Sequence, residues 1–174
     1  VDFDNIYSCL TNQDPLLARA FATQPAKWFS WLNERLEQLT GRRRRIGVRL
    51  CYFNPKAYGD VRPHIMQCGF EVVDCPALTA SGKTSADIRI AIDMLELAGF
   101  KQHYDEFILL SADADFTPVM LNLRKQGRGT VVLPVGNSSA IYRAACELVL
   151  DQEEFIQSGL RTGENHGQGN GNGN

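Results

Sequence analysis

The sequence lacks closely spaced cysteine pairs, long apolar runs and a strong excess of either charge. Its five cysteines form an odd set without Cys-x-x-Cys spacing, which excludes a disulfide framework and a zinc module and predicts plain buried or half-buried thiols in a reducing compartment. No apolar run approaches the roughly 18 residues that span a bilayer, and no basic-then-apolar leader is present. We therefore expect a soluble, cytoplasmic protein with no membrane partner.

A formal net charge of −2 argues against a strongly basic nucleic-acid coat but leaves room for a local basic rim around an acidic centre. The 174 residues, 44% of them hydrophobic, suit one globular domain, expected over residues 1–160. Residues 161–174 are rich in Gly and Asn and are expected to form a disordered tail. Residues 1–5 resemble the end of a strand and its turn, so the start of that strand is expected to be missing, as in a fragment of a longer parent chain.

Strand and helix patterns alternate along the chain. Strands are expected at residues 46–53, 70–75, 106–111 and 130–134, besides the one that ends near residue 2. Helices are expected at residues 15–22, 25–39, 60–68, 86–98, 117–126 and 139–147, with a short piece at 153–156. Alternation of this kind predicts right-handed βαβ units and a mainly parallel central sheet of about five to six strands, covered by helices on both faces.

Residues 107–116, FILLSADADF, are central to the predicted function. The apolar run suits a buried strand, and Asp113 and Asp115 follow at its carboxyl end. Ligands of open α/β sheets bind at that edge, so these carboxylates are placed to meet substrate. Asp113 leaves the strand directly, whereas Asp115 could instead cap the next helix. Asp2 and Asp4 follow the first strand in the same way.

The helix at residues 86–98 separates its acidic residues by role. At 100° per residue, Arg89, Asp93 and Glu96 share its polar stripe, so Asp93 is expected to face solvent and to pair with Arg89. Asp87 lies in the first turn, about 120° from that stripe. We expect Asp87 to point at the carboxyl edge of the sheet.

Three other features have both a functional and a structural interpretation. Trp28 and Trp31 could stack RNA bases, but their helical spacing favours core packing. The arginines at 42–45 could hold phosphates, although the amino end of a strand faces away from the expected site. Lys83, Thr84 and Ser85 precede a helix and could bind an anion, yet Ser and Thr are also ordinary helix caps.

Carboxylates from three separate segments therefore reach one edge of the sheet. Clustered like charges raise each other's pKa, so such a site needs a cation. Oxygen ligands without His or Cys favour Mg²⁺ or Mn²⁺ over Zn²⁺, and the ion would activate water for phosphodiester hydrolysis. Any single D-x-D pair is more often a turn or a helix cap, so the prediction depends on convergence of the three segments.

The sequences VDFDN (1–5), KTSAD (83–87), ADIRIAIDMLELA (86–98) and SADADFTPVMLNLRKQG (111–127) resemble the NYN-domain family of the PIN-like nuclease superfamily, close to its LabA-like branch. The resemblance implies a three-layer α/β/α Rossmann-like fold and a metal-dependent endoribonuclease. The family's functional positions fall on Asp2, Asn5, Asp87, Asp113 and Asp115. Its usual glycine and second serine in the last motif are Ala112 and Ala114 here.

The leading hypothesis is an RNA-cleaving hydrolase with Mg²⁺ or Mn²⁺ as cofactor. Its predicted catalytic and metal-binding residues are Asp2, Asp87, Asp113 and Asp115. Its predicted substrate-binding residues are Asn5, Ser111, Lys83, Thr84 and Ser85. One alternative is a haloacid-dehalogenase-like phosphatase with Asp2 as nucleophile; another is an inactive RNA-binding or protein-interaction module, because fold does not imply activity. A homodimer or a further domain stays open.

Overall fold

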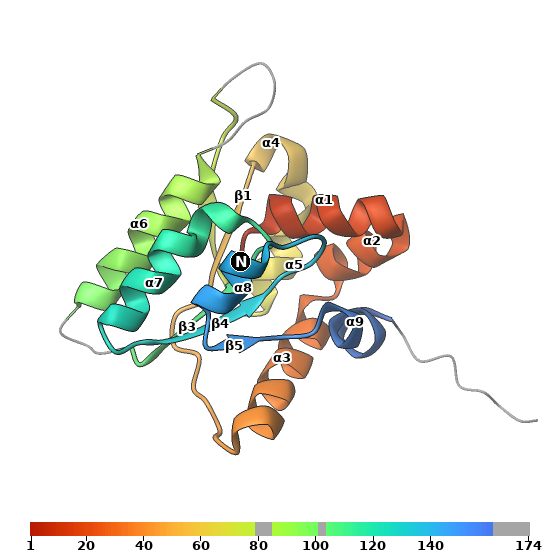
Figure 1. Cartoon of the computed structure of the whole chain (residues 1–174). Coiled ribbons are helices and arrows are strands. Elements are labelled where there is room, and N and C mark those ends of the chain that lie inside the picture. Colours follow the sequence, from red (N-terminus) through yellow and green to blue (C-terminus); the bar gives the residue numbers. More distant parts are fainter. Residues whose placement is uncertain (79–84, 101–103, 162–174) are drawn as a thin grey trace, which may run out of the picture.

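The computed structural model describes residues 1–78, 85–100 and 104–161, in which helices surround two groups of parallel strands (Figure 1). The elements, in chain order, are α1 (Phe3–Gln13), α2 (Pro15–Thr23), α3 (Pro25–Thr40), β1 (Leu50–Phe53), α4 (Pro55–Tyr58), η1 (Gly59–Val61), α5 (Arg62–Gln67), β2 (Glu71–Asp74), α6 (Ala86–Gly99), β3 (Glu106–Leu110), η2 (Ala114–Phe116), α7 (Thr117–Lys125), β4 (Gly129–Leu133), α8 (Ala140–Ala145), β5 (Leu148–Val149), α9 (Gln152–Glu154) and the π-helical turn η3 (Phe155–Leu160).

The sheet differs from the single sheet of five to six strands expected from the sequence. The described strands form a two-stranded sheet, β1-β2, and a three-stranded sheet, β3-β4-β5, and every ladder is parallel. Residues Val1 and Asp2 lie between the two sheets. The Tyr52 N–H donates to the Val1 carbonyl (2.9 Å), and the Asp2 N–H donates to the Leu110 carbonyl (3.1 Å). A bridge of two residues thus connects β1 to β3.

Helix α1 was not expected, because residues 1–5 suggested a turn after a strand. Its burial pattern explains it: Phe3, Ile6 and Leu10 recur at helical spacing and are fully buried. The helix ends where Asp14, in extended conformation, accepts a hydrogen bond from the Leu16 N–H and starts α2. Helix α1 therefore begins directly after Asp2 and fixes the direction in which the chain leaves the sheet edge.

Strand β1 is shorter than the predicted strand at residues 46–53. Arg49 still accepts a bond from the Glu71 N–H on the β2 side (2.8 Å), but regular strand begins only at Leu50, where Val1 supplies a partner on the other side. The short β5 was missed, because two residues carry no readable alternation. The predicted Gly/Asn-rich tail lies outside the described residues, except for Arg161.

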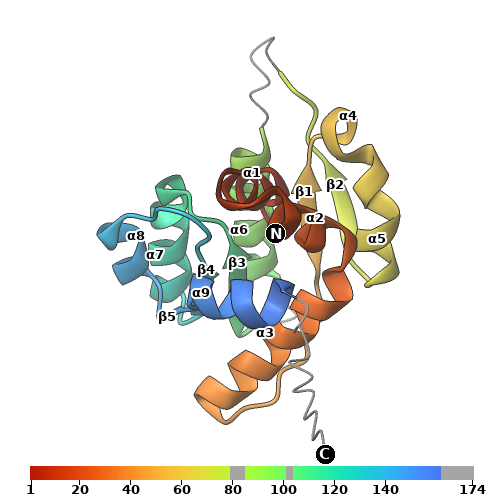
Figure 2. The same cartoon turned by 90° about the vertical axis from the view of Figure 1, so that its right-hand side faces the viewer.

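Helices cover both faces of the strands, as Figures 1 and 2 show. Strand side chains alternate between two apolar clusters: Phe53 and Leu110 pack with α1, α2 and α3, whereas Tyr52 and Leu109 pack with α6, α7 and α8. This arrangement agrees with the predicted layering. Within the ranges described, no helix combines the length and apolarity needed to cross a membrane.

The first cluster is largely aromatic, which decides the role of the tryptophan helix. Trp28 is buried, donates from Nε1 to the Phe21 carbonyl (2.9 Å) and stacks near the Phe21 ring, so its predicted role in the core is confirmed. The five cysteines are free thiols; Cys51, Cys75 and Cys146 are buried and the other two are half-buried, as predicted.

Phe3 is the residue whose truncation should unfold this end of the molecule most strongly. Its ring is fully buried and contacts the rings of Tyr7, Phe21, Phe53 and Tyr58. We expect Phe3→Ala to lower the free energy of unfolding by about 3–5 kcal/mol, because it leaves a cavity in the aromatic cluster. Urea unfolding followed by circular dichroism measures the loss.

The matched control is Leu16→Ala in α2, whose side chain is 71% exposed. That change should alter the free energy of unfolding by no more than about 0.5 kcal/mol. Similar losses in the two variants would contradict the placement of Phe3 in the core.

Candidate functional site

The site is built where the Val1–Asp2 segment and β3 end side by side. Asp2 is only 2% exposed, and its Oδ2 accepts a hydrogen bond from the hydroxyl of the fully buried Ser111 (2.7 Å). Because backbone pairing to Leu110 and this side-chain bond act together, the Asp2 carboxylate is held in one orientation. Two residues 109 positions apart in sequence thus form the centre of the site.

The turn after β3 is held by side chains that the sequence analysis assigned to substrate. Asn5, in the first turn of α1, accepts a bond at Oδ1 from the Ala112 N–H (3.1 Å). The Ser111 hydroxyl also accepts a bond from the Asp113 N–H (3.2 Å). The structure therefore places Asn5 and Ser111 at the site, where they fix the turn that carries Asp113.

Asp113 and Asp115 take different positions from each other. Asp113 is half-buried, and its Oδ1 accepts the Asp115 N–H (2.9 Å), which caps the 3-10 helix η2. Asp115 is exposed on the first turn of η2. The expectation that Asp115 could cap the next helix was wrong: Asp113 is the capping residue, and α7 begins without a side-chain cap.

Asp87 and Asp4 complete the acidic group. Asp87 is half-buried in the first turn of α6, and its charge raises the pKa of both Asp2 and Asp4. Asp4, on α1, accepts the Asn54 N–H at Oδ1 (3.3 Å) directly after β1. Three segments distant in sequence therefore bring negative charge to one edge of the sheets.

Burial dominates the electrostatics of this group. It raises the pKa of Asp2 to about 6, with Asp87 adding to the rise and the Ser111 hydroxyl, the Val1 amine and the Asn5 backbone opposing it. Burial likewise raises the pKa of Asp4 to about 6, against the bond from the Asn54 N–H and with a further rise from Asp87. Both carboxyls therefore release their protons close to neutral pH.

Asp93 does not face solvent, in contrast to the expectation from the helical wheel. Its side chain is only 12% exposed, and its Oδ2 accepts the Tyr52 hydroxyl (2.8 Å). The predicted ion pair with Arg89 is present, at 3.0 Å between Arg89 Nε and Asp93 Oδ1. Asp93 is covered because the Tyr52 side chain reaches it from β1. Helical periodicity cannot show such a contact between distant segments.

Of the remaining predicted substrate contacts, only Ser85 lies within the described ranges. Lys83 and Thr84 fall outside the described residues. Ser85 precedes α6, and its side chain makes no capping bond; its carbonyl accepts the Arg89 N–H (2.9 Å). Arg44, in the arginine run, pairs with Glu106 at the amino end of β3, opposite to Asp113, so its charge is compensated away from the acidic group.

Sequence analysis missed three residues around Asp2. Asp4 was noted but not assigned, although it is part of the same D-x-D pair. Asn54 and Tyr142 carried no signal: Asn54 donates its backbone N–H to Asp4, and the buried Tyr142 hydroxyl donates to the Ser111 carbonyl (3.3 Å). Burial raises the pKa of Tyr142, and the charges of Asp2 and Asp113 add to that rise, so Tyr142 stays a neutral donor.

The donor chemistry of the site fits a hard divalent cation. Its carboxylates offer oxygen ligands alone, and burial, with a further contribution from the charge of Asp87, raises the pKa of Asp2 and Asp4 to about 6. Among the described residues, no three Asp, Glu, His or Cys side chains are grouped closely enough to hold a metal ion. Binding would therefore require the carboxylates to draw together.

The acidic group lies at the carboxyl edge of parallel strands in an α/β domain, the edge at which ligands of such folds bind. The chain belongs to the NYN-domain family, whose model matches residues 1–153 and which is part of the PIN-like nuclease superfamily. The fold also resembles the crystal structure of a Vibrio parahaemolyticus protein of unknown function, with a TM-score of 0.60 and 17% identity over 86% of this chain and 87% of that one. The comparison with curated proteins gives no match to this chain.

The buried Asp2 carboxyl should make stability depend on pH. Its pKa is about 6 in the folded state and 3.8 when unperturbed. A raised pKa means that its favourable contribution is complete below pH 3.8 and is lost as pH rises through 6. We expect Asp2→Asn, which cannot ionise, to gain about 1–3 kcal/mol of unfolding free energy relative to the native chain between these pH values.

Urea unfolding in chelator, from pH 3.5 to 8, measures that difference for the two proteins. Asp4 titrates in both of them, so subtracting the curves isolates Asp2. Parallel curves over the whole range would show that the Asp2 carboxyl is not held in a desolvated position.

Proposed function

We propose that this protein is a metal-dependent endoribonuclease that hydrolyses RNA phosphodiester bonds at the acidic group formed by Asp2, Asp4, Asp87 and Asp113. The observation that carries the proposal is the meeting of three distant segments at one sheet edge, with Asp2 buried and oriented by Ser111. Membership of a nuclease superfamily supports the same conclusion.

Mg²⁺ or Mn²⁺ would be held by Asp2, Asp87 and Asp113, with Asp115 as a further ligand or as a group that orients water. The ion would supply charge neutralisation and a more acidic bound water. The chain itself positions the carboxylates through hydrogen bonds. Ser111 holds the Asp2 carboxylate, and Asn5 holds the turn on which Asp113 lies.

Proton transfer is the second contribution of the chain. Groups with a pKa near the working pH are the most effective general bases, and burial raises the pKa of Asp4, which is not assigned to the ion, to about 6. Asp4 is half-buried and more accessible than Asp2, so it is the better placed of the two to accept a proton from water. Asp4 thus joins the proposed catalytic residues.

Three finer assignments belong to this proposal. The substrate is RNA, the branch of the family is the LabA-like one, and the protein works in the cytoplasm without a membrane partner. Lys83, Thr84 and Ser85 would contact phosphate at the rim. A homodimer or a further domain stays a prediction from sequence.

A second function, RNA binding without cleavage, is favoured by one observation. No three carboxylates in the described ranges are grouped closely enough to hold an ion, which is the arrangement expected of a site that binds RNA without cleaving it. The phosphatase hypothesis is disfavoured, because a nucleophilic Asp2 must reach a phosphate, whereas its side chain is buried and bound to Ser111.

The test compares purified native protein with Asp87→Asn and Asp113→Asn on end-labelled RNA, with Mg²⁺, with Mn²⁺ and with chelator. We expect cleavage only with metal, and a loss of at least about a hundredfold in each variant, because each would lose a charged oxygen at the reacting phosphate. Denaturing gels measure the rate of fragment release.

Asp93→Asn is the matched control. It removes a carboxylate from α6, the helix that also carries Asp87, but this carboxylate binds the Tyr52 hydroxyl and is not part of the acidic group. It should keep the cleavage rate within about threefold while lowering stability, since a partly buried hydrogen bond to a charged group is weakened. Equal cleavage by native protein, Asp87→Asn and Asp113→Asn would overturn the site. RNA binding without fragments under both metals would favour the inactive module.

A further inference from the structure

Two half-buried tyrosines lie beside the acidic group, on helices α1 and α4 (Figure 1). Tyr7 follows Asp4 by three residues on α1, so the two side chains share one side of that helix. Tyr58 ends α4, the short helix that begins after Asn54, whose N–H binds the Asp4 carboxylate. Burial raises the pKa of Tyr58, and the negative charge of Asp4 adds to that rise. Both tyrosines are therefore neighbours of Asp4.

The two tyrosine rings contact each other and a buried ring beneath them. The ring centroids of Tyr7 and Tyr58 are 5.0 Å apart, and the ring planes are inclined by 60°. The fully buried Phe3 ring is stacked with Tyr7 (5.6 Å) and makes an edge contact with Tyr58 (5.1 Å). Because Phe3 belongs to the aromatic core, the positions of both tyrosine rings are fixed before any ligand binds.

The hydroxyls of these two tyrosines are available to a ligand. Among the hydrogen bonds of the described residues, none involves the hydroxyl of Tyr7 or Tyr58, and neither oxygen is one of the buried polar atoms without a partner. The buried Tyr52 and Tyr142 hydroxyls, in contrast, both donate hydrogen bonds inside the protein. Since the hydroxyl of a core tyrosine usually has a protein partner, Tyr7 and Tyr58 differ from the core tyrosines and present their polar ends to solvent.

The charge around the two rings favours a neutral, flat ligand group. Asp2, Asp4 and Asp87 lie at the same edge, so an anionic group bound directly at the rings would be repelled. A nucleobase carries no charge, offers a face that stacks on aromatic side chains, and has N–H and carbonyl groups for the two hydroxyls. Of the parts of a nucleotide, the base is therefore the one that suits Tyr7 and Tyr58.

We propose that Tyr7 and Tyr58 form a nucleobase site, which holds one unpaired base of the RNA beside the acidic group. This inference rests on the proposed function, which gives RNA as the ligand. In a duplex both faces of a base are covered by its neighbours, so the site accepts only a nucleotide that has left the stack. The phosphodiester next to that base is the one brought to Asp4, so the two tyrosines determine where an RNA is cut.

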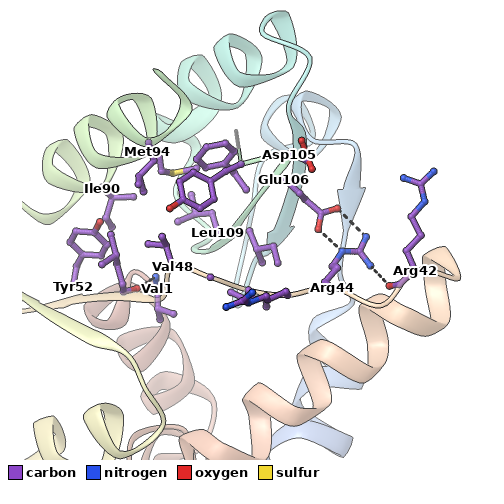
Figure 3. A pocket seen from close by; sticks show the side chains of 18 of the residues that line it. Val1, Arg42, Arg44, Val48, Tyr52, Ile90, Met94, Asp105, Glu106 and Leu109 are labelled. Carbon is purple, nitrogen blue, oxygen red and sulfur yellow. Dashed lines mark hydrogen bonds and ion pairs between the residues drawn. The ribbon is translucent and has the colours of Figure 1, made fainter. Parts of the chain in front are cut away.

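Tyr104 is the matched control, because it lies at the other end of the strands. It is half-buried like the two tyrosines of the nucleobase site and comes two residues before β3. It lines a groove of about 530 Å³ in which Arg44 pairs with Glu106 (Figure 3). This groove is at the amino end of β3, whereas the acidic group is at its carboxyl end. A substitution at Tyr104 should therefore leave the nucleobase site unchanged.

The test measures, by fluorescence anisotropy, the binding of a labelled, unpaired RNA of about eight nucleotides. It uses the full chain with Asp113→Asn and Mg²⁺, so that the proposed cleavage is off. Tyr7→Leu and Tyr58→Leu, which keep an apolar side chain but lose the ring, should each weaken binding at least about tenfold. Tyr58→Phe keeps the ring and should stay within about threefold, as should Tyr104→Leu.

A second measurement keeps the native side chains. Irradiation of the native protein in chelator with the same RNA carrying 5-iodouridine should attach the RNA to Tyr7 or Tyr58, and mass spectrometry of the peptides identifies the residue. Adducts only at other residues, or none, would overturn the nucleobase site. Equal binding by Tyr58→Leu and Tyr104→Leu, or no binding of the RNA by the parent protein, would do the same.

The nucleobase site and the hydrolase fail in different ways. If the native protein cleaves RNA with metal while the tyrosine variants bind and cut as it does, the nucleobase site is wrong and the hydrolase stands. If binding depends on the two rings but neither metal gives fragments, the hydrolase is wrong and the site belongs to an RNA-binding module.

Discussion

The backbone pairing of two residues, Val1 and Asp2, is the contact on which the rest of this structure depends. It is the connection that ties the sheet of β1 to the sheet of β3, and it places a carboxylate at the junction. Helix α1 leaves from the same point and carries Asn5 and Asp4 to the site. Local backbone geometry at one dipeptide thus sets both the architecture and the position of the acidic group.

The acidic group is electrostatically costly in the absence of a counter-ion. Burial and the neighbouring Asp87 both disfavour the ionised form of Asp2, and the Ser111 hydroxyl only partly opposes them. A fold selected for stability alone would replace such a residue with an apolar one or pair it with a cation. Unfavourable electrostatics at the edge where α/β proteins bind ligands is typical of a functional site.

Much of the fold followed from the sequence because its signals are local. Helices α2, α3, α6 and α7 have apolar periodicity and clear end signals, and Gly41 ends α3 in the left-handed region as expected for a helix terminus. Helix α1 was missed because its pattern begins inside a stretch that resembles a strand end. The single sheet was wrong for the described residues because pairing between β1 and β3 depends on a two-residue contact.

The candidate site also contains residues that local sequence signals identify and residues that only long-range contacts identify. Asp2, Asp87 and Asp113 could be proposed from sequence because D-x-D turns at strand ends and a helix start are readable there, and their catalytic and metal-binding roles stay predictions. Asp93 was misplaced because its partner, Tyr52, is 41 residues away. The supports of the site, Asn54 and Tyr142, act through contacts that no linear pattern contains, so only the folded chain reveals them.

Tyr52, on β1, contacts both the first residue of the chain and helix α6. Its amide holds the Val1 carbonyl, and its hydroxyl holds Asp93 in the middle of α6, the helix whose first turn bears Asp87. One residue therefore ties the position of Asp2 to the position of a second carboxylate through rigid elements. A change at Tyr52 would therefore act in two places at once, on the backbone pairing that positions Asp2 and on the helix that bears Asp87.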